Sequence, residues 1–504
     1  MKWTILSAAA AALMAACGGG GGGGPDFKTR EELIDSETCK DCHEDHYREW
    51  SGSMHAYASD DPVFRAMNAR GQRETDGALG DFCVKCHAPM AVREGATTDG
   101  LNLDDVPGQL KGVTCFFCHS VDSVDGAHNN PLVLADDLVM RGEYDDPVDN
   151  EAHPAAYSPL HDRDQADSAQ LCGTCHDIVV DERAAIERTF TEWQASVFSQ
   201  PGGATCGQCH MDQSTNLRPI ADDENADVAA RRYHSHMFPA IDVALTPDFP
   251  EADAQRDAVQ SFLDSTLQSA LCVAPFGAGE DAKTAIRVVL DNVAAGHGFP
   301  SGSAQDRRIW IEVVAYRGDE VVYQSGVVPE GELVTTPPDP PDPDRWLLRD
   351  CMLDADGNPV SMFWQADDYE TNQLPAQVTF DANDPAFYKS HIVQFFPRDS
   401  RDPSAALIPG LIDRVTLRVL VQPMGLDVLG ELVDSGDLSA DIVDQMPTYE
   451  IDLGDGPVLE WTADTANQEY SDLDLHVTAS CISLTNLNAA ADKVPATNHT
   501  ACQP

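Results

Sequence analysis

Five copies of one short motif, Cys-x-x-Cys-His, constrain this 504-residue chain more than any other feature of its sequence. With 15 Cys and 16 His, random placement would give on the order of 0.01 copies. Two thiols at this spacing can add to both vinyl groups of one porphyrin, and the adjacent imidazole can then bind the iron. The motif therefore predicts five covalently attached haem c groups, with thioether bonds to Cys39, Cys42, Cys83, Cys86, Cys115, Cys118, Cys172, Cys175, Cys206 and Cys209, and proximal iron ligands His43, His87, His119, His176 and His210.

Two other uses of paired cysteines have to be weighed against haem. Cys-x-x-Cys pairs also build zinc sites and redox-active disulfides. Zinc sites use such pairs two by two, so five pairs would leave one over. Neither use requires a histidine directly after every second cysteine. We therefore favour haem over a zinc or disulfide framework.

The N-terminus indicates export. Residues 1–16 combine Lys2 with a short apolar run and small residues, and this run is too short to cross a bilayer. Leu13 to Ala16 resemble the cleavage box of a bacterial lipoprotein, although Met14 is unusual there. We expect Cys17 to be lipidated and residues 17–25 to be a glycine tether, which anchors the chain in the bacterial cell envelope, on the periplasmic or outer-membrane face. An ordinary signal peptide is the alternative.

Acidic residues dominate the charge of the chain. The sequence has 84 Asp and Glu against 32 Lys and Arg, a formal net charge of −52. Such a chain would repel nucleic acid and anionic lipid. It suits a redox partner protein with a basic docking face, or solubility at high salt.

The pattern of apolar residues predicts two regions. We expect residues 26–275 to form a pentahaem cytochrome c domain of short helices and loops around packed haems, and residues 276–504 to form an all-β, sandwich-like domain. Apolar spacing predicts helices over residues 183–198 and 251–272, and a helical insertion over 426–446. Strands are expected at 285–293, 309–316, 321–328, 391–396 and 414–421.

Four cysteines remain after the haem sites and Cys17. An even remainder in an exported protein favours two disulfides. Among the three possible pairings we prefer Cys272–Cys351 with Cys481–Cys502.

The haem region resembles a known family. The pattern of Cys39, Cys42 and His43 followed by Tyr47, Trp50, Ser53 and His55-Ala56 is similar to the multihaem cytochromes c related to cytochrome c-554, a tetrahaem electron carrier. The stretches CVKCHAP, GVTCFFCHSV, LCGTCHD, RRYHSHMF and NVAAGHGFPSG resemble larger relatives. The resemblance covers roughly residues 37–315 and implies an exported electron-transfer protein with mostly bis-histidine haems.

A second imidazole for each iron must come from elsewhere in the chain. His55 is in the context that resembles the family, and His153 and His236 are in similar stretches. His297 lies between two glycines, which would let the backbone approach a haem face. The second ligand of the fifth iron is not assigned. We prefer His128, and His46, His161 and His234 are the alternatives. Met90 and Met211 follow attachment sites too closely to reach the opposite face, and His391, His476 and His499 lack a supporting context.

A calcium site is a weaker hypothesis. Asp339, Asp342 and Asp344 could bind calcium through their carboxylates. A solvated acidic loop explains the same residues more simply.

Three functions remain in competition. The first is an electron conduit, with no catalytic residues. The second is a multihaem oxidoreductase with one open-faced catalytic haem acting on a nitrogen or sulfur oxyanion, although no Cys-x-x-Cys-Lys variant of the pentahaem nitrite reductases is present. The third is a surface binding protein that uses its β domain. We favour the conduit.

Overall fold

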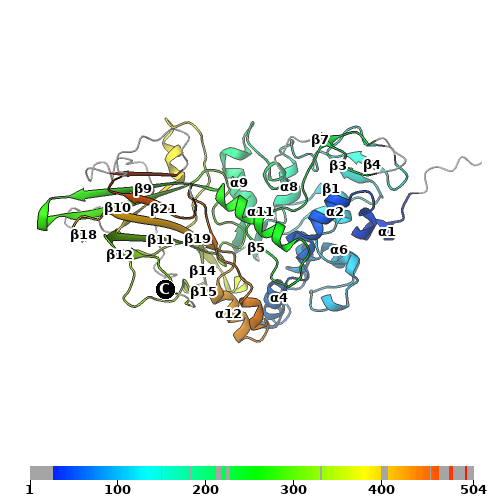
Figure 1. Cartoon of the computed structure of the whole chain (residues 1–504). Helices are drawn as coiled ribbons and strands as arrows, with labels where there is room; N and C mark the ends of the chain where they lie inside the picture. The colour runs from blue at the N-terminus through cyan, green and yellow to red at the C-terminus, as the bar shows by residue number, and fades with distance from the viewer. Residues whose placement is uncertain are drawn as a thin grey trace, which may run out of the picture.

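The computed structural model describes residues 27–148, 150–180, 183–211, 217–222, 228–329, 332–398, 407–454, 456–464, 476–480 and 494–496. Figure 1 shows a region of helices and short strands beside a region of long strands, with α11 near their junction. The predicted signal peptide, the lipidated Cys17 and the tether lie outside these residues, as do Cys481 and Cys502.

Short helices dominate the first region. They are α1 (Arg30–Ile34), α2 (Glu44–Ser51), α3 (Met54–Tyr57), α4 (Pro62–Glu74), α5 (Val84–His87), α6 (Pro89–Arg93), α7 (Cys115–His119), α8 (Ser168–Gly173), α9 (Thr189–Ala195), α10 (Cys206–His210) and α11 (Ala252–Asp264). Two-stranded sheets join β1 (Val121–Val124) to β2 (Leu132–Leu134), β3 (Met140–Gly142) to β4 (Ala155–Tyr157), β5 (Asp177–Val180) to β6 (Ala184–Arg188), and β7 (Leu217–Arg218) to β8 (Arg231–Arg232). Single 3₁₀ turns lie at η1 (Ser36–Cys39), η2 (Leu103–Asp105), η3 (Gly108–Leu110) and η4 (Val197–Ser199).

Two six-stranded sheets build the second region. One contains β22 (His476–Ser480), β9 (Leu267–Phe276), β10 (Lys283–Asn292), β17 (His391–Phe396), β23 (Val494–Pro495) and β18 (Ile408–Pro409). The other contains β12 (Glu320–Ser325), β11 (Arg308–Arg317), β19 (Arg414–Gln422), β20 (Tyr449–Glu450), β13 (Trp346–Leu348) and β21 (Leu459–Thr462). A smaller sheet joins β15 (Pro359–Val360), β14 (Asp350–Leu353) and β16 (Asp368–Thr371), and the helices are α12 (Leu426–Asp434), α13 (Ala440–Val443), η5 (Gly279–Asp281), η6 (Phe363–Gln365) and η7 (Pro385–Ser390).

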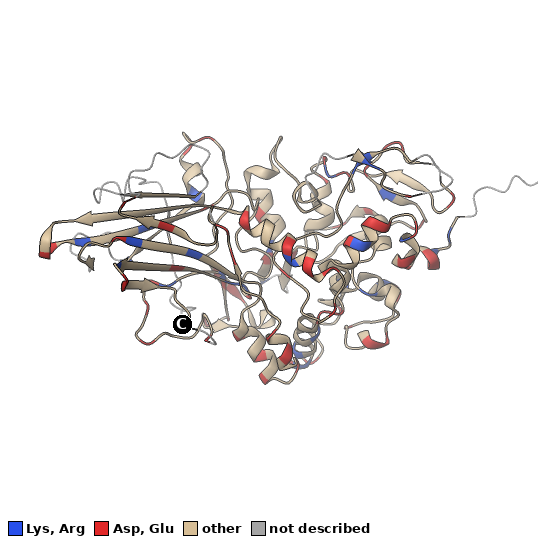
Figure 2. Cartoon of the chain, viewed as in Figure 1, with Lys and Arg blue, Asp and Glu red and all other residues tan. Residues whose placement is uncertain are grey.

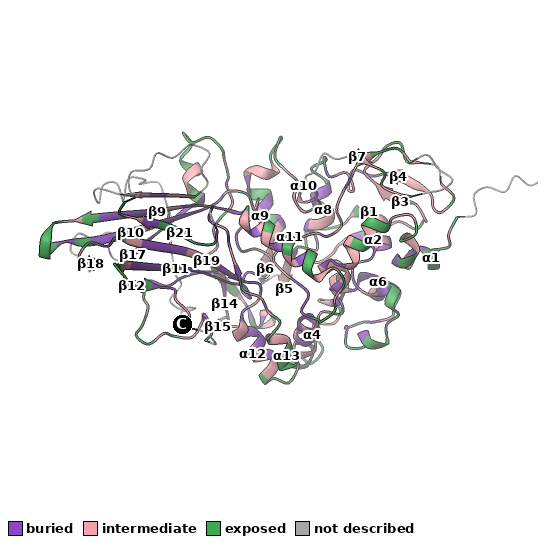
Figure 3. Cartoon of the chain, viewed as in Figure 1, coloured by how far each residue is buried: buried purple, intermediate pink, exposed green. Residues whose placement is uncertain are grey.

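One hydrophobic core joins the two large sheets to each other and to the helical region. Ile286 and Val288 of β10 and Ile311 of β11 are fully buried in it. The same core takes in Val63 from α4 and Val259 from α11. Figure 3 shows the long strands as the most buried part of the chain. Because the core crosses from strands to helices, the β region holds the helices of the first region in place.

The predicted strands and the helical insertion are confirmed, and two predicted helices are wrong in part. Residues 183–198 contain the strand β6 before α9 begins, because residues 184–188 pair with β5. The helix predicted over 251–272 ends at Asp264, and β9 follows from Leu267. β9 pairs with β10 along its whole length, from Leu267 opposite Asn292 to Phe276 opposite Lys283.

Three further features bear on the sequence predictions. Cys272 and Cys351 are both disulfide-bonded, while their pairing stays a prediction. Asp342 accepts hydrogen bonds from the backbone N–H groups of Gly326 and Asp344, and Asp344 accepts one from Tyr323, so these carboxylates fasten their loop. Within the described ranges no group of three or more His, Cys, Asp or Glu side chains is placed to hold a metal ion, and none of the helices there is long and apolar enough to cross a bilayer.

Candidate haem-binding site

The signature residues fold so that thiols and imidazole share one side of a helical turn. The His43 N–H donates to the Cys39 carbonyl (2.8 Å), and the His87 N–H donates to that of Cys83 (3.3 Å). In α7 and α10 the whole signature is helical, and Thr114 and Thr205 cap the two helices with their hydroxyls. Residues four apart in a helix lie one above the other, so each histidine stands beside the first cysteine of its signature.

Most of the candidate iron ligands are oriented by the same contact. Their Nδ1 atoms lie within hydrogen-bond distance of backbone carbonyls, and a carbonyl can only accept, so Nδ1 carries the hydrogen. This leaves Nε2 for a metal, the arrangement usual for metal-binding histidine. The pairs are His43 with Ile220, His87 with Ala58, His119 with Arg141, His210 with Pro239, His153 with Pro154, His236 with His234 and His297 with Gly298, at 2.6–3.1 Å.

Four of the five proximal histidines face a second imidazole. The ring centroids are 6.4 Å apart for His43 and His153, 6.3 Å for His55 and His176, 6.3 Å for His119 and His236, and 6.4 Å for His210 and His297. A metal–nitrogen bond of about 2 Å on each side, plus the ring radius, gives roughly 6 Å between centroids. Each pair therefore has the spacing that one iron bound between two imidazoles requires.

His87 differs from the other four. Phe64 from α4 stacks on its ring at 4.0 Å, with an angle of 5° between the planes. In the described part of the chain no second imidazole lies against His87. His128, the preferred fifth ligand, is exposed in the turn between β1 and β2, so the geometry gives that prediction no support.

The remaining candidates are used elsewhere. His46 stacks on Tyr233, and the Nε2 of His161 lies 2.8 Å from the carbonyl oxygen of Cys118. The Nε2 of His234 lies 2.9 Å from Glu143 Oε1. In the β region, His391 lies beside Asp291 and His476 beside Ser269.

One continuous cavity of about 1380 Å³ connects all five signatures. All ten signature cysteines and all four imidazole pairs line it. Protein interiors are normally packed to crystal density, so a cavity of this size needs a large group to fill it. The residues present therefore fit haem, because they provide the thiols, the imidazoles and the space together.

Burial sets the protonation of the imidazoles. It lowers the pKa of His55 and of His236 to about 3, and that of His210 to about 4. These side chains are therefore neutral at neutral pH, which is the form that binds metals.

Contacts between thiols show which signatures are neighbours. The thiols of Cys39 and Cys115 interact, which places the first signature beside the third. The second and fourth meet at Cys86 and Cys175. The fourth and fifth meet through a similar contact, between Cys172 and Cys206, and the charge of Cys172 also acts on Cys118 of the third. The fourth signature thus lies beside three others.

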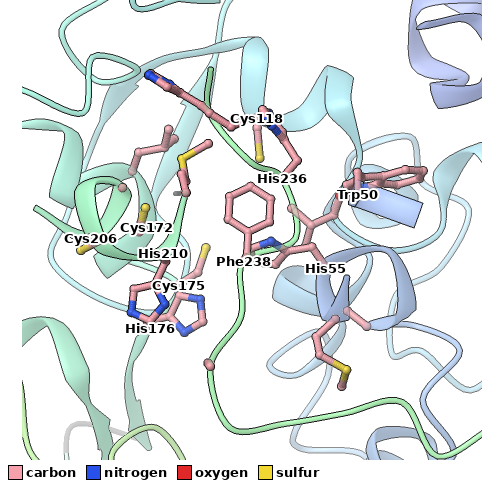
Figure 4. A pocket seen from close by; sticks show the side chains of 18 of the residues that line it. Trp50, His55, Cys118, Cys172, Cys175, His176, Cys206, His210, His236 and Phe238 are labelled. Atoms are coloured by element: carbon pink, nitrogen blue, oxygen red, sulfur yellow. Dashed lines mark hydrogen bonds between the residues drawn. The ribbon is translucent and has the colours of Figure 1, made fainter. Parts of the chain in front are cut away.

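Phe238 lies between two of the imidazole pairs. Its ring centroid is 4.7 Å from that of His55 and 5.5 Å from that of His236 (Figure 4). Trp50 and Trp193 also line the cavity, and their indole N–H groups donate to the carbonyls of Val113 and Ala204. Sequence reasoning missed Phe64 and Phe238, since a lone phenylalanine carries no motif.

Comparisons with known proteins agree with this geometry. Residues 38–120, which hold the first three signatures, match the family described as cytochrome c554 and c-prime. A penta-haem cytochrome c552 from Thermochromatium tepidum has a similar fold, with a TM-score of 0.55 and 19% identity over 86% of this chain and 99% of that one. No curated protein matches the chain. The two matches support a relation to the multihaem cytochromes c.

Proposed function

We propose, from this relation to the multihaem cytochromes c, that the chain transfers electrons through five covalently attached haems, four of them ligated by two histidines. The four imidazole pairs at 6.3–6.4 Å carry this proposal. Each haem would supply an iron that changes charge by one electron. Two imidazoles would hold each such iron in nearly the same geometry in both redox states, which favours rapid electron transfer.

Mass spectrometry with electron paramagnetic resonance tests this proposal. The mature protein should carry the added mass of five haems, and its ferric spectrum should be dominated by low-spin signals from four irons. A lower haem mass, or high-spin signals from most irons, would contradict the proposal.

The site at His87 favours a second, catalytic function. Phe64 stacks on His87, and no second imidazole of the described residues lies against it, so an iron there would keep a coordination position for a small molecule. Nitric oxide or cyanide should then change the spectrum of one haem in five. If neither ligand changes the spectrum, the protein is a conduit alone.

The N-terminal residues and the net charge, rather than the haem site, are the basis for proposing export and a redox partner. We infer a signal peptide over residues 1–16, a lipid on Cys17, and a basic redox partner for the net charge of −52. Replacing Cys17 by serine should release the protein from membranes while all five haems stay attached. Retention of the Cys17→Ser variant in membranes would contradict the anchor.

A further inference from the structure

A group of charged residues lines the haem cavity beside His87. It comprises Asp61 at the start of α4, Glu187 in β6, Asp242, and Asp306 and Arg307 just before β11. Arg307 holds both oxygens of Asp242 in a bidentate ion pair. Glu187 accepts a hydrogen bond from the Ser303 hydroxyl at 2.7 Å. We call these five residues the acid cluster.

The acid cluster is close to the second haem signature. The side chain of Asp61 caps α4, and Phe64, three residues later, stacks on His87. The carbonyl of Ala58, three residues before Asp61, accepts the Nδ1 hydrogen of His87. The charge of Glu187 acts on His87, on Asp306 and on Arg307. The cluster and His87 therefore share one electrostatic environment.

Two polar atoms, one in the cluster and one on the residue that precedes Asp306, have no hydrogen-bond partner among the described residues. They are Gln305 Oε1 and Arg307 Nε, on side chains from residues that are 6% and 5% exposed. Buried polar atoms are nearly always satisfied, by protein or by water. Both residues line the cavity, so these atoms mark places where a polar group held in the cavity would lie beside the carboxyls.

Two carboxyls of the cluster, the buried Asp306 and the half-buried Asp61, differ from ordinary aspartates. Burial raises the pKa of Asp306 to about 6, and the negative charge of Glu187 raises it further. The positive charges nearby act in the opposite direction; they belong to Arg308, Arg307 and Arg349. Burial also raises the pKa of Asp61 to about 7, and the negative charge of Asp242 adds to this effect. Hydrogen bonds from the backbone N–H groups of Val63 and Phe64 lower the pKa by less. Both side chains can therefore bind or release a proton near neutral pH.

We propose that Asp61 and Asp306 form a proton-uptake site that couples protonation to electron arrival at His87. This proposal rests on the proposed electron-transfer function. On one-electron reduction of the site at His87 by a one-electron donor, one of the two carboxylates takes a proton from solvent and becomes a carboxylic acid. No other bond changes, and the charge around His87 stays constant.

The midpoint potential of the haem at His87 tests this proposal. In the complete haem-loaded protein, that potential should fall as the pH rises above about 6, because reduction then requires proton uptake. A tenfold change in proton concentration corresponds to about 59 mV for one proton and one electron. Spectroelectrochemical titration from about pH 5 to about pH 9 would measure this slope from the absorption of the haem at His87.

Substitutions test whether Asp61 and Asp306 are the groups that take up the proton. Asp61→Asn and Asp306→Asn should each reduce the slope, and the double variant should abolish it. Asp104→Asn removes one charge from a side chain that is 82% exposed, and should leave the slope unchanged. A slope that persists in the double variant, or one that is absent from the wild-type protein, would overturn the proposal.

Two controls separate this proposal from the proposed function. Haem mass and the low-spin signals, measured on the same samples, report whether the electron-transfer assignment holds. Infrared difference spectra of the wild-type protein, oxidised minus reduced, do not depend on whether a variant folds. They should show a protonated carboxyl appearing on reduction, and the absence of that band would also overturn the proposal.

Discussion

The histidines of this chain differ in which ring nitrogen contacts another group of the protein. His43 and His297 direct Nδ1 to a backbone carbonyl and leave Nε2 toward the cavity. His161 and His234 instead have Nε2 against Cys118 and Glu143. The sequence presents all of these as similar loop histidines, so it does not distinguish the ligands among them from the exposed His128.

Replacing His297 by alanine should change one iron and leave the others. The His210 site would lose its second imidazole while both thioether cysteines remain, so five haems should still be attached. Electron paramagnetic resonance should show one additional high-spin iron. His128→Ala, at an exposed position, is the matched control and should resemble the wild type. An unchanged spectrum for His297→Ala would refute the assignment.

Asp61 should make stability depend on pH. Its folded pKa of about 7 exceeds that of the unfolded chain, so the folded state binds more protons and stability falls as the pH rises from about 4 to about 7. Asn can still cap α4 without carrying the buried charge. Asp61→Asn should therefore raise the unfolding free energy by about 1–3 kcal/mol at pH 8 and leave it unchanged below about pH 4. Thermal melts at both pH values measure this, and equal gains at both would exclude a charge effect.

At the scale of elements, the sequence predicted strands better than helix ends. Alternating residues of β19 such as Val415, Leu417 and Val419 all enter the core, so their period of two was a reliable signal. Residues 184–188 and 267–272 also present apolar side chains at helical spacing. Their strand structure comes from pairing with β5 and β10, a partner choice that local periodicity does not contain.

Asn292 holds the connection between β10 and β11 that carries His297. Its Nδ2 donates to the carbonyl oxygens of His297 (2.6 Å) and Leu374 (3.2 Å), and its Oδ1 accepts from the Ala295 N–H. Asn292→Ala should cost about 1–3 kcal/mol of stability, because the His297 carbonyl would lose its Asn292 donor and that of Leu374 would lose one of two. It should also shift the potential of the His210 haem. Gln324→Ala, exposed on β12, is the control for both measurements.

At the scale of the whole molecule, acidic residues lie on both regions. Figure 2 shows them along α1, α11 and α12 as well as on the strands. Several of the ion pairs are partly exposed, such as Arg48 with Glu251, and contribute little to stability. The excess of acid is therefore more important for the choice of partner than for the fold.

Electron transfer to a basic partner should depend strongly on salt. The reduced protein should reduce a small basic cytochrome at least about tenfold more slowly at 0.5 M than at 0.01 M NaCl, because the Debye length falls well below 10 Å. An acidic acceptor of similar potential should show the opposite trend. Stopped-flow absorbance measures both rates, and equal salt dependence for the two acceptors would argue against steering by charge.

The walls of the haem cavity come from almost the full length of the chain, from Lys28 to Met446. During biogenesis the second region emerges last, so the early signatures are without their final enclosure while it is still being made. Cytochrome maturation enzymes would then meet an open substrate, and thioether formation would precede the last folding step. Attachment of the proposed haems and consolidation of the core would thus occur in a fixed temporal order.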